Sequence, residues 1–202
     1  APIVLIVNPA VPANDVRELI ALAKKEPGKI NFASAGNGTT NHLSGELFKS
    51  RANIDIVHVP YRGAGPAMND IVGGHVQMFF DLMPVVLPQI ATGKVRALAV
   101  STAKRIPNFP DIPTFREVGQ DLVAATWFSL SGPARLPSDI VQKTSRETLK
   151  AMQLPEVQKR LALDAIESRL MSPEEFTKLP FRFSMRRSRF WQLCRRPGLF
   201  QP

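Results

Sequence analysis

Residues 30–48 read INFASAGNGTTNHLSGELF, and this stretch decides the fold class of the chain. The segment 30–33 predicts a strand, and Leu43 and Leu47 repeat at the spacing of a helix face. The glycine-rich segment 34–42 between them predicts a sharp turn from strand into helix. The stretch therefore has the organisation of one strand–turn–helix unit of an α/β protein.

The same alternation of strand and helix patterns extends over the first hundred residues. Residues 3–7 form a continuous apolar run, which is typical of a strand buried on both faces. Further strands are predicted at 54–59, 76–81 and 95–101, and helices after Asn14 or Asp15, across 61–72 and across 85–92. Strands that alternate with crossover helices predict an α/β fold with a mainly parallel sheet.

The pattern changes after Thr102. Three prolines, Pro107, Pro110 and Pro113, predict an extended connector over 105–114. Beyond it, the sequence predicts strands at 126–131 and 165–170 and helices at 137–152 and 155–161. We expect a ligand-binding α/β domain at 1–125 and a second unit at 126–179, which is too short to bury much core alone.

A helix start is predicted at Ser172, with Pro173 and Glu175 in its first turn. Leu179 and Pro180 stop this helix after about one turn, and residues 180–202 hold six Arg and no acid. This tail carries six of the nine formal positive charges, so residues 1–179 keep 20 basic and 17 acidic groups, a net of +3. We interpret 180–202 as an aberrant or disordered basic tail, by hypothesis a frameshift product or fusion scar, and expect no nucleic-acid binding.

The cysteine content and the hydropathy of the chain exclude several kinds of site and segment. Cys194 is the only cysteine, which excludes an intramolecular disulfide and a multi-cysteine metal site. No apolar run reaches the roughly 18 residues of a membrane helix, so we expect no membrane insertion. The chain begins at Ala1 inside a strand pattern without a signal segment, which predicts either that processing removed an upstream part or that the chain is a fragment.

The turn at 34–42 is the best candidate for a binding site. Gly36 and Gly38 let the backbone approach a ligand, and the helix that follows offers unpaired N–H groups and the positive end of its dipole. Side-chain donors are added by Ser34, Asn37, Thr39 and Thr40. Asn41 stands where a dinucleotide fingerprint needs Gly or Ala, and no Walker lysine follows, so a small carboxylate fits better than a nucleotide. The alternative is that the Ser and Thr side chains only cap the helix.

Two neighbouring turns could contribute to the same site, because the carboxyl ends of parallel strands meet at one edge of a sheet. Tyr61 could hydrogen-bond or stack, and Arg62 could offer charge unless it is a solvated surface residue. Asp81 could accept an amine or hydroxyl of the ligand, or simply cap the next helix.

The sequence offers no recognisable catalytic or metal-binding pattern. It has no Gly-x-Ser-x-Gly elbow and no His-Glu-x-x-His motif. His42, His58 and His75 stand far apart, with no Cys or paired acids at ligand spacing. We therefore expect no catalytic residue, metal or cofactor, and interpret the three histidines as capping, surface or hydrogen-bonded residues.

Five segments together resemble the Bug family, the extracytoplasmic solute receptors of tripartite tricarboxylate transporters. The segments are ASAGNGTTNHL at 33–43, HVPYRG at 58–63, DIVGGHV at 70–76, GKVRALAV at 93–100 and PDIPT at 110–114, with Phe80 and Asp81 between the third and the fourth. The resemblance extends from Ala1 to about Glu175. It implies a flytrap-like periplasmic binding protein of type II, with one nearly complete domain and an incomplete second one, because family members are longer at the front. Residues 126–179 would belong to that incomplete partner domain.

The resemblance also implies a ligand, a partner and a site. The receptor would close on a small carboxylate, such as a dicarboxylate, tricarboxylate, amino acid or aromatic acid, and deliver it to a membrane permease. The loop 34–40 would grip the carboxylate, with Asp81 near the cleft, and the receptor would act as a monomer. The expected ligand-binding residues are Ser34, Ala35, Gly36, Asn37, Gly38, Thr39, Thr40, Tyr61, Gly63 and Asp81.

Two alternatives remain at this point. The chain could be a small α/β enzyme that uses the glycine loop on a phosphorylated or carboxylated metabolite, although no acid–base pair supports this. It could also be a ligand-dependent partner in sensing.

Overall fold

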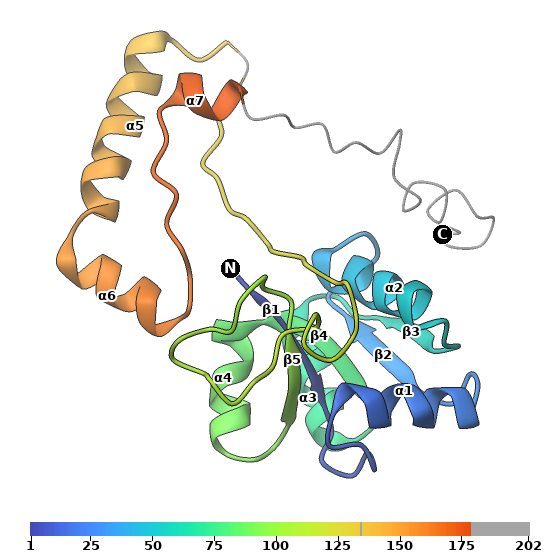
Figure 1. The fold of residues 1–202 in the computed structure, drawn as a ribbon. Helices are drawn as coiled ribbons and strands as arrows, with labels where there is room; N and C mark the ends of the chain where they lie inside the picture. The colour runs from blue at the N-terminus through green and yellow to red at the C-terminus, as the bar shows by residue number, and fades with distance from the viewer. Residues whose placement is uncertain (134, 179–202) are drawn as a thin grey trace. The chain divides into compact units, whose positions relative to one another are not determined.

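The computed structural model describes residues 1–133 and 135–178, which divide by their contacts into two units, the first Ala1–Trp127 and the second beginning at Phe128 (Figure 1). The predicted basic tail at 180–202, including Cys194, lies outside the described residues. The assignment of 126–179 to an incomplete partner domain stays a prediction.

The first unit is built on one five-stranded sheet (Figure 1). Its strands are β1 (Ile3–Val7), β2 (Asn31–Ser34), β3 (Val57–Pro60), β4 (Met78–Leu82) and β5 (Arg96–Val100), in the order β3-β2-β4-β1-β5. β2 pairs in parallel with both β3 and β4, whereas β1 is antiparallel to β4 and β5. The α/β class is therefore confirmed, in a mixed sheet.

The orientation of β1 is the difference from the expected strand arrangement. The chain passes from β4 to β5 through α4 and leaves a gap one strand wide, which β1 fills in the opposite direction. All five residues of β1 are buried, as its unbroken apolar sequence predicts for a central strand.

Four helices cover the sheet: α1 (Val16–Lys25), α2 (Thr40–Ala52), α3 (Ala64–Gly73) and α4 (Met83–Ala91). Asp15 caps α1, accepting a hydrogen bond from the Glu18 N–H at 2.8 Å, as its sequence position predicts. The main core lies where α1 and α2 pack on one face of the sheet. Phe48 of α2 meets Phe80 of β4 and Phe115 of the connector, each at a ring-centroid distance of 5.8 Å.

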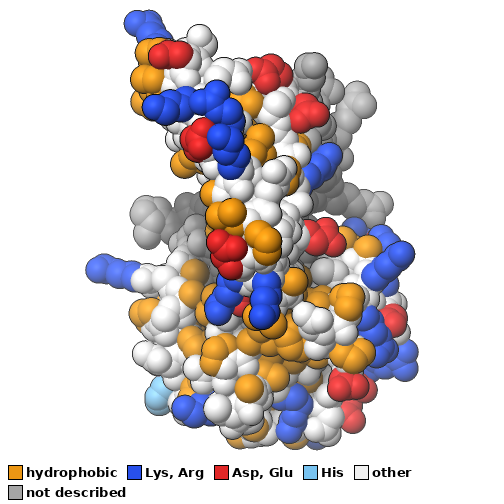
Figure 2. All heavy atoms as spheres, turned by 90° about the vertical axis from the view of Figure 1, so that its left-hand side faces the viewer, with side chains coloured by type: hydrophobic (Ala, Val, Ile, Leu, Met, Phe, Trp, Pro, Cys, Tyr) orange, Lys and Arg blue, Asp and Glu red, His pale blue; other side chains and the backbone are white. Residues whose placement is uncertain are grey.

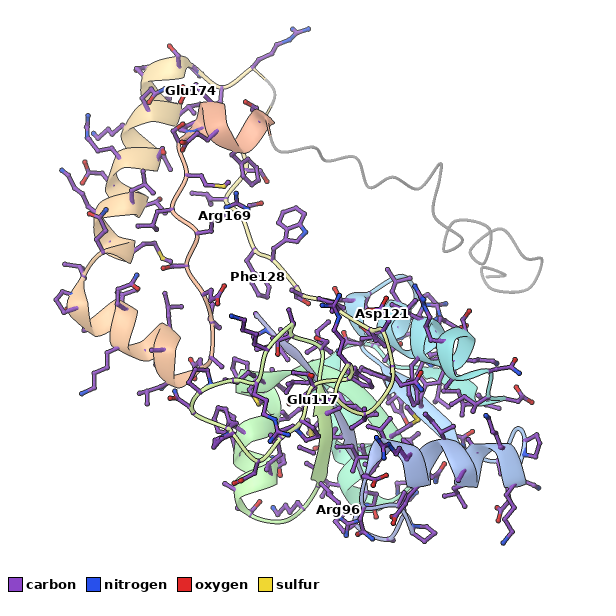
Figure 3. All side chains as sticks on the ribbon, in the orientation of Figure 1. Arg96, Glu117, Asp121, Phe128, Arg169 and Glu174 are labelled. Carbon is purple, nitrogen blue, oxygen red and sulfur yellow. The ribbon has the colours of Figure 1, made fainter. Side chains whose placement is uncertain are left out.

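The proline-rich connector after β5 forms turns without helix or strand and is tied to the unit by polar contacts. Arg105 Nε lies 3.0 Å from Glu117 Oε1, and the Glu117 Oε2 accepts from the Thr114 N–H at 2.7 Å. At the other end of β5, Arg96 Nη1 donates to the Ala13 carbonyl at 2.9 Å (Figure 3).

The described residues of the second unit form three helices: α5 (Ser138–Met152), α6 (Pro155–Leu163) and α7 (Pro173–Lys178). The predicted cap of α7 is present, since Ser172 Oγ accepts from the Glu175 N–H at 3.1 Å and Glu175 Oε2 accepts from the Ser172 N–H at 2.8 Å. Neither α5 nor α6 has a buried residue, and apolar side chains reach the surface among charged ones (Figure 2). None of the helices in the described ranges is long and apolar enough to cross a membrane.

Two predicted strands are absent from the structure. Residues 126–131 have no regular structure, and Phe128 is 72% exposed and projects from the chain (Figure 3). Residues 166–170 are likewise irregular, after a turn in which Ala165 has a φ of 55°. Apolar alternation makes a strand only where a neighbouring strand supplies hydrogen bonds. The Thr126 N–H donates to the Ala1 carbonyl at 3.0 Å, but no described strand continues this pairing along the rest of 126–131 or lies beside 166–170.

Candidate functional site

The glycine loop leaves the end of β2 and enters the first turn of α2, as predicted. Gly36 has a φ of 135° and Gly38 a φ of 78°, backbone conformations that a side chain strongly disfavours. A Cβ on Gly36 would also lie 3.5 Å from the Tyr61 carbonyl oxygen. The two glycines are therefore required by the path of the backbone.

Thr39 both closes the loop and begins the helix. Its Oγ1 donates to the Gly36 carbonyl at 2.7 Å, and its N–H donates to the same oxygen at 3.3 Å. The same Oγ1 lies 3.5 Å from the His42 nitrogen as the cap of α2. Thr39 thus caps α2 and closes the loop with the same hydroxyl. Among the hydrogen bonds of the described residues, the N–H groups of Thr40 and Asn41 have no acceptor, which leaves two donors at the positive end of α2.

Ser34 lies beneath the loop rather than on its surface. Its side chain is fully buried, and its Oγ lies 2.6 Å from His58 Nε2 and 3.2 Å from the Gly36 nitrogen. The hydroxyl therefore positions the loop. Asn37 and Gly38 are the exposed residues of the loop, and Thr39 and Thr40 are half-buried.

The turn after β3 is joined to the glycine loop through its backbone. The Tyr61 N–H donates to the Ser34 carbonyl at 3.0 Å, and the Gly63 N–H donates to the Ala35 carbonyl at 3.2 Å. The Tyr61 hydroxyl donates to Asp70 Oδ2 at 2.6 Å, and burial together with this carboxylate raises the pKa of Tyr61 to about 12. Tyr61 is thus neutral and already hydrogen-bonded.

Asp81 ends β4 just below the same edge and is only 3% exposed. Its Oδ1 accepts from Asn41 Nδ2 at 2.9 Å and from the Leu82 N–H at 2.8 Å. Its Oδ2 is buried and has no hydrogen-bond partner in the described part of the chain. Burial raises the pKa of Asp81, outweighing the two hydrogen bonds that lower it.

The structure brings the candidate residues together as the parallel strands predict. β2, β3 and β4 end side by side, so the loop 34–40, the turn at 61–63 and Asp81 share one edge of the sheet. They differ in depth, since Ser34 and Asp81 are buried below residues that solvent reaches.

Sequence reasoning missed Asn41 and a pair of histidines. Asn41 Nδ2 donates to the Phe80 carbonyl at 2.6 Å as well as to Asp81, and so ties α2 to the end of β4. His42 and His58, described above as far apart, are stacked with ring centroids 3.9 Å apart. Only the pairing of β2 with β3 brings them together, which no local pattern reveals.

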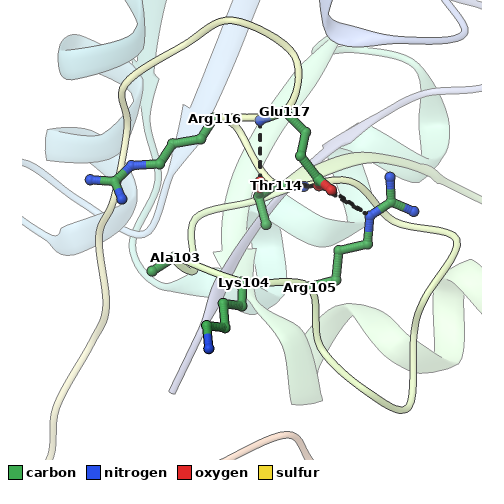
Figure 4. A pocket seen from close by; sticks show the side chains of 6 residues that line it. All are labelled: Ala103, Lys104, Arg105, Thr114, Arg116 and Glu117. Carbon is green, nitrogen blue, oxygen red and sulfur yellow. Dashed lines mark hydrogen bonds and ion pairs between the residues drawn. The ribbon is translucent and has the colours of Figure 1, made fainter.

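A separate pocket lies on the connector (Figure 4). It encloses about 430 Å³ and is lined by Ala103, Lys104, Arg105, Thr114, Arg116 and Glu117, none of which is a predicted site residue. Within residues 1–133 and 135–178 no group of three His, Cys, Asp or Glu side chains is arranged to hold a metal ion.

Comparisons with known proteins identify one family. A model of the tripartite tricarboxylate transporter family receptor matches residues 1–192. A UPF0065 protein from the tcbD–tcbE intergenic region of Pseudomonas sp. strain P51 is 36% identical over 88% of this chain and 54% of its own length. Protein BugT of Bordetella pertussis is 34% identical over 86% of this chain and 54% of its own length.

A solved structure agrees with this assignment. The R. palustris protein Rpa4515, determined with adipate, superposes with a TM-score of 0.84 at 31% identity, covering 87% of this chain and 59% of its own. The chain spans about half the length of the curated relatives that it matches.

Proposed function

The chain belongs to the receptor family of the tripartite tricarboxylate transporters, and on that premise we propose that it is the carboxylate-binding part of a periplasmic solute receptor. In this role it captures a small carboxylate as a monomer and passes it to the membrane permease of the transporter. The resemblance to Bug proteins seen in the sequence is confirmed by the family match and by BugT.

One observation carries the proposal: the start of α2 presents unpaired N–H groups in a loop held rigid by short-range hydrogen bonds. The N–H groups of Thr40 and Asn41 point where a carboxylate gains both hydrogen bonds and the favourable helix dipole. Thr39 and Gly36 fix the loop before the ligand arrives, so little conformational entropy is lost on binding.

The chemistry of the loop favours a carboxylate over a phosphate. Residues 34–42 contain no Lys or Arg, so the loop lacks the charge that phosphate sites usually employ. A dicarboxylate of the size of adipate, the ligand found with the R. palustris relative, is the first candidate. The second carboxylate would meet residues beyond the loop, and Arg62, which is exposed on the adjacent turn, is the candidate partner.

A receptor role is preferred to catalysis because the nucleophile–base contact found in the described part of the chain is inaccessible. Ser34 Oγ and His58 Nε2 lie 2.6 Å apart, a spacing typical of a nucleophile and its base. Since Ser34 is fully buried beneath the loop, a substrate does not reach it.

Calorimetry of the 202-residue chain with a panel of C4–C6 dicarboxylates, adipate included, tests the proposal. Thr39→Val removes the loop-closing hydroxyl and should weaken binding about tenfold, which corresponds to about 1.4 kcal/mol. Thr92→Val is the matched control, because Thr92 Oγ1 makes a similar local bond, 3.0 Å to the Pro88 carbonyl, at the far end of α4. Equal affinities for wild type and Thr39→Val would contradict the site, and no binding by any dicarboxylate would contradict the function.

A further inference from the structure

Three stacked rings lie beneath the glycine loop, each from a different element. Phe32 of β2 lies 4.9 Å from the ring of His58 of β3, which in turn lies 3.9 Å from the ring of His42 of α2. The planes of the two imidazoles differ by only 14°. Residues 16 positions apart in the sequence are thus packed face to face.

Each imidazole holds one end of the loop. His42 Nδ1 accepts a hydrogen bond from the Gly38 N–H at 3.0 Å. His58 Nε2 lies 2.6 Å from Ser34 Oγ, which in turn accepts from the Gly36 N–H at 3.2 Å. The two glycines whose backbone conformations shape the loop are therefore held, directly or through one hydroxyl, by the stacked pair.

The hydrogen bonds determine the protonation state that this arrangement needs. Because His42 Nδ1 accepts from a backbone N–H, it carries no proton, and the single proton of the neutral ring is on Nε2. A second proton would convert the acceptor into a donor facing another donor. It would also place a positive charge against the second, half-buried imidazole, whose ring centroid is 3.9 Å away.

The neighbouring charged groups do not offset the cost of a positive charge on the His42 ring. Glu46 Oε1 is 3.9 Å from His42 Nε2, but burial raises the pKa of Glu46 and Lys49 competes for it. Asp81 of β4 is bonded to Asn41, and Asp70 of α3 to the Tyr61 hydroxyl. β2 has no charged residue, and β3 contributes only His58. Burial lowers the pKa of His42, and burial with the neighbouring His42 lowers the pKa of His58 to about 4.

We propose that His42 and His58 are positioning residues that hold the carboxylate-binding loop in shape only while both rings are neutral, so that acid loosens the loop and weakens ligand binding. The effect on ligand rests on the proposed function, whereas the effect on the loop does not. The opposite behaviour is physically possible, since an imidazolium could attract a carboxylate directly, and the sign of the pH dependence separates the two.

Nuclear magnetic resonance of the 202-residue chain tests the loop without any ligand. We expect His42 to be neutral, with its proton on Nε2. We also expect the amide hydrogen of Gly38 to exchange with solvent about tenfold more slowly in wild type than in His42→Leu. His42→Asn is the conservative variant, because the Asn Oδ1 replaces Nδ1 as acceptor and does not titrate. It should keep the Gly38 amide protected down to about pH 5, where wild type loses protection. His75→Asn, at an exposed histidine after α3, should behave as wild type.

Calorimetry with adipate supplies the second readout. Between about pH 7.5 and pH 5, wild type should lose about tenfold more affinity than His42→Asn, and ligand protonation cancels because it is common to both proteins. Affinity that rises in acid, a protonated Nδ1 at neutral pH, or identical pH profiles for the two proteins would overturn the inference. If the resonance results hold but adipate and related dicarboxylates do not bind, the proposed function fails and the positioning role stands.

Discussion

Replacing Gly45 by alanine gives the sharpest test of the packing beneath the site. Gly45 is buried in α2, and a Cβ at this position would lie 2.2 Å from Phe32 Cε2, 2.5 Å from Cδ2 and 2.9 Å from Cζ. Ordinary carbon contacts are about 3.5–4.0 Å, so the ring must move by more than about 1 Å. Phe32 is fully buried and stacked on His58, so the surrounding structure resists that movement.

Two opposing effects determine how much Gly45→Ala changes the free energy of unfolding. Overpacking of a core costs about 1–3 kcal/mol, and the upper part of this range is expected because the overlap involves three ring atoms. Alanine in place of glycine inside a helix returns about 1 kcal/mol. The net expectation is a loss of about 1–2 kcal/mol in the free energy of unfolding, or about 2–8 °C in Tm.

Urea unfolding followed by circular dichroism measures this loss. Gly65→Ala is the matched control, since Gly65 is also helical, in α3, and a Cβ there would meet nothing within 4 Å. The control should be unchanged or up to about 1 kcal/mol more stable. A Gly45→Ala variant at least as stable as wild type would refute the steric argument.

Three further predictions follow from the titratable groups. Tyr61 is the only tyrosine of the chain, so absorbance titration should show ionisation near pH 12 in the native protein and about two units lower in urea. The pKa of His58 in the folded protein lies below its ordinary value, so the unfolded chain binds a proton more readily as the pH falls. The free energy of unfolding should therefore fall between pH 6.5 and about pH 4, by up to about 1.4 kcal/mol per pH unit. The variant His58→Gln should reduce this slope. The pKa of Asp81 is raised in the folded protein, so its ionised carboxylate opposes folding. The variant Asp81→Asn should therefore become more stable relative to wild type as the pH rises from 4 to 7. A difference between the two urea midpoints that stays constant with pH would contradict this.

Local features of the fold were predictable because their signals are local. Asp15 and the Ser172–Glu175 pair cap their helices where the sequence indicates, and the turn at 34–42 connects a strand to a helix as its glycines require. The direction of β1 was not predictable, because an apolar run fixes burial and not orientation. Residues 126–131 had the pattern of a strand, but no described strand pairs with this segment beyond Thr126.

The candidate site likewise has features that the local sequence predicts and contacts that it does not. The sequence locates the loop and the helix start that follows it, because Gly36, Gly38 and Thr39 lie within four consecutive residues. It does not reveal that Asn41 binds Asp81 or that the two histidines are stacked, because these contacts join different elements. Whether the ten predicted residues contact a ligand stays a prediction.

The backbone bonds between the two turns restrict how this candidate binding edge can vary in evolution. Tyr61 N–H to Ser34 O and Gly63 N–H to Ala35 O continue the β2–β3 pairing beyond the strands, so an insertion or deletion in either turn would shift both. Loop length is therefore a poor route to a new ligand preference. Side-chain replacement at the exposed positions Asn37 and Arg62 leaves the bonds intact, and libraries that aim to alter specificity should begin there.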